Sequence, residues 1–77
     1  MATLIPWGLL WYDGDPRRPL EEKVCMAAER YVQKYGRVPN TCVVHPEVVG
    51  QGTVLAGGYR VVCHPTVLRD HFWIGEA

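Results

Sequence analysis

The chain of 77 residues contains no serine at all. None of its lysines lies in the setting of a nucleotide-binding loop. Serine-dependent hydrolysis is therefore excluded, because that chemistry needs a serine hydroxyl as its nucleophile. The segment from Gly50 to Leu55 begins like a dinucleotide-binding loop, with Gly50 and Gly52 in place. Leu55 stands where the third glycine belongs and no helix is predicted to follow, so a loop that cradles phosphate is not supported.

The chain also lacks net charge, since eight basic residues balance eight acidic residues. A neutral chain does not exert the long-range attraction that draws proteins to phosphate backbones or anionic lipid. General binding to nucleic acid or to a membrane surface is therefore not expected. Self-association is easier for such a chain than for a strongly charged one.

Long apolar runs and a regular cysteine framework are absent too. No run approaches the roughly 18 apolar residues that span a bilayer. Pro6 interrupts the run from Leu4 to Tyr12, which argues against a signal peptide. Cys25, Cys42 and Cys63 cannot all pair within one chain and lack the spacing of a disulfide framework. We therefore predict a reducing compartment and a cytoplasmic protein.

Length and composition predict a single domain over residues 1–77. A chain this short buries only about 60% of the surface that its unfolded form exposes, which is too little for two cores. Its hydrophobic fraction of 48% is typical of globular proteins, whereas its charged fraction of 21% is slightly low. Order is therefore expected, together with an apolar contact surface.

Charged residues are concentrated in the first half of the chain, where one amphipathic helix is predicted. Residues 13–37 hold 11 of the 16 charged side chains, whereas residues 42–68 hold two. Pro19 suits the first turn of the helix, and Gly36 supplies a left-handed cap. Apolar residues recur at three- and four-residue spacing and form one stripe. They are Leu20, Val24, Ala27, Ala28, Tyr31, Val32 and Tyr35.

Five strands are predicted around this helix, over residues 8–12, 41–45, 53–56, 59–64 and 71–74. The first is expected to be buried on both faces. Gly57 and Gly58 form a two-residue hairpin turn between the third and the fourth. The order β-α-β-β-β-β predicts an α/β fold of the α+β two-layer sandwich type, with a mixed sheet of four to five strands. The first two strands are predicted to be parallel neighbours with a right-handed crossover.

The predicted strands carry apolar residues on both faces, and a single long helix covers only one face of a sheet. The leading hypothesis is therefore a small non-enzymatic protein-interaction module, homodimeric through the uncovered sheet face. Candidate interface residues are Trp11, Val44, Val62, Phe72 and Trp73. No motif specifies a reaction, and the identity of other protein partners is left open.

A second hypothesis places a divalent metal, such as zinc or manganese, at one edge of the sheet. If each strand after residue 45 reverses direction, this edge gathers all three histidines and several carboxylates. The candidate ligands or bases are His45, His64, His71, Asp13 and Asp15. With a metal bound there, the chain would be a metal-binding protein or a metal-dependent hydrolase. The alternative is that these are ordinary polar residues of exposed turns.

A third hypothesis is the binding of single-stranded nucleic acid on an aromatic and basic sheet surface. The candidate residues are Tyr59, Arg60, Arg69, Phe72 and Trp73. The alternative places these aromatic residues in the core or in an interface. Cys42 and His45 are not expected to share an ion, because strand residues three apart point to opposite faces. A disulfide between Cys42 and Cys63 would require that their strands are neighbours.

Overall fold

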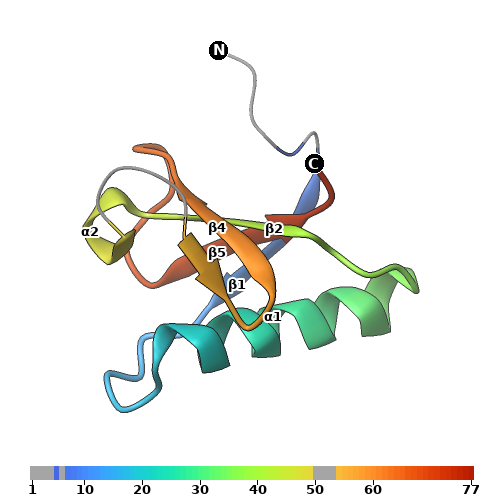
Figure 1. Cartoon of the computed structure of the whole chain (residues 1–77), viewed down its shortest axis with the longest axis horizontal. Helices are drawn as coiled ribbons and strands as arrows, with labels where there is room; N and C mark the ends of the chain where they lie inside the picture. The colour runs from blue at the N-terminus through green and yellow to red at the C-terminus, as the bar shows by residue number, and fades with distance from the viewer. Residues whose placement is uncertain (1–4, 6, 50–53) are drawn as a thin grey trace.

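The computed structural model describes residues 5, 7–49 and 54–77. It is a two-layer α+β sandwich in which one long helix, α1 (Leu20–Tyr35), lies against one face of a five-stranded mixed sheet (Figure 1). The predicted order β-α-β-β-β-β is confirmed, with an additional short helix, α2 (Pro46–Val49), after the second strand. The loop at Gly50 to Gly52 and the first residue of the predicted third strand, Thr53, lie outside the described residues.

Helix α1 has the bounds that its sequence predicts. Pro19 precedes it in an extended conformation, and Glu21 and Glu22 occupy its first turn near the positive end of the helix dipole. Gly36 adopts a left-handed conformation with φ of 69° and donates its N–H to the carbonyl of Val32 at 2.8 Å. The face turned to the sheet buries Val24, Ala27, Ala28 and Tyr31.

The strands are β1 (Gly8–Tyr12), β2 (Thr41–Val44), β3 (Val54–Ala56), β4 (Tyr59–Cys63) and β5 (His71–Gly75). Their order in the sheet is β1-β5-β2-β4-β3. Strands β2 and β4 are parallel, and the other three neighbouring pairs are antiparallel. The third and fourth strands form the predicted hairpin, with positive φ at both Gly57 and Gly58 and with Ala56 opposite Tyr59.

Two predictions about β1 are wrong. It runs parallel to β2, but β5 lies between them, so the first two strands are not neighbours. It is also not buried on both faces, because Leu10 and Tyr12 are 57% and 63% exposed. Strand β5 takes the inner position and buries Phe72 and Ile74, which leaves β1 at the edge of the sheet.

Polar contacts attach the chain after β5 to α1 and to the loop that follows α1. The Tyr31 hydroxyl donates to the Glu76 carboxylate at 3.0 Å, and the Arg37 guanidinium donates to the same carboxylate at 2.7 and 2.9 Å. Arg37 lowers the pKa of Glu76 below its usual value. Burial and the neighbouring Glu76 raise the pKa of Tyr31. The charged form of Glu76 is therefore the one that stabilises this contact.

Candidate functional site

The face of the sheet opposite α1 is partly covered by the chain itself. Val43 and Val62 are only 4% and 8% exposed there, because Ile5 packs on them and Val67 and Trp73 pack beside them. Ile5 fits over a glycine pair at one end of the sheet. A Cβ atom added to Gly75 would lie 2.6 Å from the Ile5 Cγ2 atom. The second face is therefore less exposed than the strand pattern alone implies.

Three of the five predicted interface residues do not lie on this face. Trp11, Val44 and Phe72 belong to the cluster that packs against α1, and Val44 and Phe72 are almost fully buried in it. Val62 and Trp73 lie on the opposite face. Strand alternation groups residues by face, but it does not say which group meets the helix.

An apolar patch remains exposed on the opposite face, beside the covered part. Its members, which we call the β1–β5 patch, are Leu10, Tyr12, Leu68 and Trp73. Leu10, Tyr12 and Leu68 are each more than half exposed, and Trp73 is half-buried. Leu10 and Trp73 are opposite each other in the β1–β5 register. The patch borders a groove of about 320 Å³ lined by Leu10, Thr66, Val67, Leu68, His71 and Trp73.

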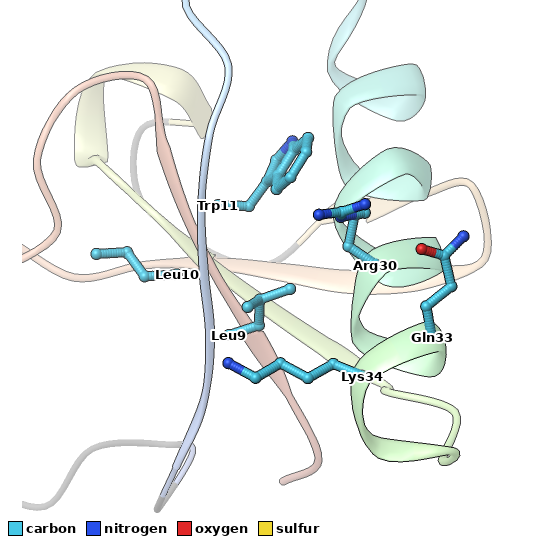
Figure 2. A pocket seen from close by; sticks show the side chains of 6 residues that line it. All are labelled: Leu9, Leu10, Trp11, Arg30, Gln33 and Lys34. Carbon is cyan, nitrogen blue, oxygen red and sulfur yellow. The ribbon is translucent and has the colours of Figure 1, made fainter.

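A second groove, of about 440 Å³, lies on the other side of β1, between this strand and α1. Figure 2 shows Leu9 and Trp11 pointing from β1 toward the helix, and Arg30 and Lys34 reaching from the helix toward β1. The Arg30 guanidinium carbon lies 5.6 Å from the centre of the Trp11 ring, within cation–π range. The Trp11 indole nitrogen is buried and has no hydrogen-bond partner among the described residues. Edge strand β1 is thus bordered by a groove on each side.

The strand directions agree with the predicted gathering of polar residues at one edge. Strands β1, β2 and β4 end there and β5 begins there. Each histidine, however, is held within its own turn. His45 Nδ1 accepts the N–H of Glu47 at 3.0 Å, and His64 Nδ1 accepts the N–H of Thr66 at 3.2 Å.

The remaining members of this edge are also engaged locally. His71 Nδ1 donates to the Arg69 carbonyl at 2.8 Å. Asp13 accepts from Arg18 Nε at 3.0 Å, and Asp15 accepts from Arg17. Within residues 5, 7–49 and 54–77, no three His, Cys, Asp or Glu side chains are grouped so that they could hold a metal ion. The geometry of the described residues therefore does not support a metal centre.

The five residues predicted to bind nucleic acid are divided between the two sides of the sheet. Tyr59 and Phe72 pack into the cluster that faces α1. Arg60 and Trp73 point to the opposite face. Arg69, on the loop before β5, forms an ion pair with Glu47 of α2. A stacking platform needs its aromatic rings on one exposed surface, and these residues do not provide one.

The cysteines are not in disulfides, although β2 and β4 are neighbours. Cys42 is opposite Val61 and Cys63 is opposite Val44, so the two cysteines are not in register. Burial raises the pKa of the Cys42 thiol to about 12. This thiol therefore behaves as a small apolar side chain at neutral pH.

Comparison with known protein families, with curated proteins and with solved structures found no match to this chain. Within the part of the chain that the structure describes, no helix is long and apolar enough to cross a bilayer. Any function must therefore be argued from the chain's own residues.

Some residues that border the two grooves are not marked out by any pattern in the sequence. They are Leu10, Leu68, Arg30 and Lys34. The four-residue spacing of Arg30 and Lys34 does place them one helical turn apart. Only the position of β1 at the sheet edge, however, brings a strand beside them.

Proposed function

We propose that this protein is a small non-enzymatic interaction module that forms a homodimer through the β1–β5 patch. The observation that carries the proposal is the exposure of Leu10 and Leu68, which are 57% and 68% exposed and line one apolar groove, and of Tyr12, which is 63% exposed and packs against the lining residue His71. Single exposed apolar residues are ordinary, but a contiguous group beside a groove is typical of a contact surface.

We expect the two copies to be related by a two-fold axis. In such a contact the same surface is used by both copies, so Leu68 of each copy would enter the groove beside Trp73 of the other. None of the described residues that line the groove is formally charged, and the chain has no net charge to oppose association. A standard interface buries about 800 Å² of each partner. The chain exposes 4825 Å², so the contact would take about one sixth of its surface.

Sedimentation velocity over a range of protein concentrations tests the proposal. The wild-type chain should shift from monomer to dimer as its concentration rises. Leu68→Glu should remain monomeric, because it would place a charge inside the contact. Val38→Glu is the matched control, since Val38 is 69% exposed in a loop that belongs to neither groove.

The control should dimerise like the wild-type chain. A wild-type chain that stays monomeric throughout would refute the proposal. So would equal dimerisation of Leu68→Glu and Val38→Glu, because the contact would then lie elsewhere.

A further inference from the structure

We infer that the free edge of β1 is a docking site for an extended, acidic segment of a partner protein, which would add to the sheet as a sixth strand. This site shares the apolar groove beside Leu10 and Trp73 with the dimer contact proposed above, but the two contacts differ in what else they use. The dimer would use a face of the sheet, whereas the added strand would use the backbone groups along its edge.

Among the residues that the structure describes, the outer edge of β1 pairs with no other strand. The N–H of Asp13 donates to the carbonyl of Asp70 at 2.9 Å, just beyond the β1–β5 ladder. In antiparallel pairs the bonded residues alternate, so Leu9 and Trp11 direct their backbone groups toward β5. Those of Gly8, Leu10 and Tyr12 then point away from the sheet. No strand among the described residues lies beyond β1 to receive them.

This edge also lacks the usual protection against strand addition. Exposed edges commonly carry charged side chains, proline or a bulge, which prevent pairing with another chain. Strand β1 has the sequence Gly-Leu-Leu-Trp-Tyr and pairs with β5 in unbroken register. Backbone pairing requires a polypeptide, so the edge selects an extended peptide over other classes of ligand.

The two grooves match the side-chain pattern of such a peptide. Successive side chains of a strand point to opposite faces, so those of an added strand would enter the two grooves alternately. One set would meet the groove beside α1 and the other the apolar groove beside Leu10 and Trp73. The sites on both sides of β1 therefore act as one recognition surface.

The charge of the groove between β1 and α1 determines which peptide side chains it binds. Arg30 and Lys34 line the groove, and none of the described residues that line it is acidic. Neither cation forms an ion pair with a residue that the structure describes. They lie one helical turn apart, a rise of about 6 Å. Two residues of a strand span about 6.6 Å. Acidic residues at alternate positions of the peptide would therefore match both cations, with an apolar residue between them.

The same charges disfavour a second copy of the chain as the occupant. Two copies of β1 paired about a two-fold axis would place Arg30 and Lys34 of both copies on the same side of the joined sheet. The four positive charges would repel one another, whereas an acidic peptide neutralises them. A partner segment with alternating acidic and apolar residues fits this edge better than β1 of a second chain.

A capped hexapeptide of alternating glutamate and valine is a suitable probe, with alternating lysine and valine as its charge-reversed control. We expect the glutamate peptide, but not the lysine peptide, to slow hydrogen exchange at the amides of Gly8, Leu10 and Tyr12. Binding should weaken as salt concentration rises.

Two variants separate the contributions of charge and backbone. Reversal of both charges, Arg30→Glu with Lys34→Glu, should weaken binding of the glutamate peptide about tenfold or more, since exposed ion pairs contribute modestly. Lys23→Glu is the matched control on the same helix and should bind normally. Leu10→Pro should remain folded, because it removes an N–H that points away from β5, and it should lose binding.

Three results would overturn the inference. The first is no change in exchange at the three amides with the glutamate peptide. The second is equal binding of both peptides. The third is protection of these amides in the protein alone, with a dimer that Leu10→Pro disrupts and Leu68→Glu does not. That third result would assign the edge to a second copy. Failure of the homodimer proposed above would instead appear in sedimentation and leave peptide binding unchanged.

Discussion

The turn between β3 and β4 allows a sharp test of how the hairpin meets α1. Gly57 and Gly58 have φ of 60° and 86°, values that an L-residue rarely adopts. Their surroundings differ. A Cβ atom at Gly57 would lie 2.5 Å from the Sγ atom of Cys25 on α1, whereas a Cβ atom at Gly58 would have no neighbour within 4 Å among the described residues.

Substitution of alanine at the two positions should therefore separate backbone strain from a steric clash. Left-handed backbone costs about 1 to 2 kcal/mol for an L-residue, and this strain applies to both variants. Gly57→Ala must also displace the Cys25 thiol, which adds about 1 kcal/mol for an altered rotamer. We expect Cys25→Ala to recover that added cost in Gly57→Ala and to recover nothing in Gly58→Ala.

Urea unfolding of the wild type, the three single variants and the two double variants measures these differences. All proteins should be compared at one concentration, because dimerisation would add to the apparent stability. A coupling free energy of about 1 kcal/mol between positions 25 and 57, and none between 25 and 58, is expected. Equal coupling at both positions would refute the reasoning, since the clash would then not explain the difference. No coupling at either would refute it too.

Two further predictions concern titratable groups. Arg37 holds the pKa of Glu76 below its usual value of 4.5, so the stabilisation is present above that pH and is lost as pH falls through the lower folded-state pKa. Glu76→Gln should therefore be less stable than the wild type near neutral pH, and the difference in urea midpoints should vanish on acidification; a constant difference would contradict this assignment. Burial raises the pKa of Cys42 to about 12, so a thiol reagent near neutral pH should modify exposed Cys25 in the folded protein and Cys42 only after unfolding. Equal labelling of the two in mass spectra of the folded protein would show that Cys42 is accessible.

Local signals in the sequence predicted the local elements well. Helix α1 follows from its apolar stripe, with Gly36 ending it, and the hairpin follows from adjacent glycines that permit positive φ. Helix α2 was not predicted, because four residues are too few to show a helical period. Its turn is set by the Val48 N–H, which donates to the His45 carbonyl at 3.0 Å.

The order of the strands could not be predicted in the same way. Pairing of β1 with β5 joins residues such as Leu9 and Ile74, which are at opposite ends of the chain and share no local pattern. This pairing moves β1 to the edge and exposes Leu10, and it brings Arg30 and Lys34 beside a strand. The candidate site therefore depends on contacts between distant residues. At the predicted histidine edge the strand directions agree with the prediction, but Nδ1 of each ring is engaged within its own turn, and the described residues there form no group that could hold a metal.

The burial of Ile5 has a practical consequence for work with this protein. The Ile5 side chain helps Val67 and Trp73 to cover Val43 and Val62, and it does so from a position ahead of the first strand. A recombinant protein that lacks Ile5 would expose additional apolar surface beside the β1–β5 patch. Non-specific association through that surface could then be mistaken for native dimerisation, so association is best measured on chains that retain this isoleucine.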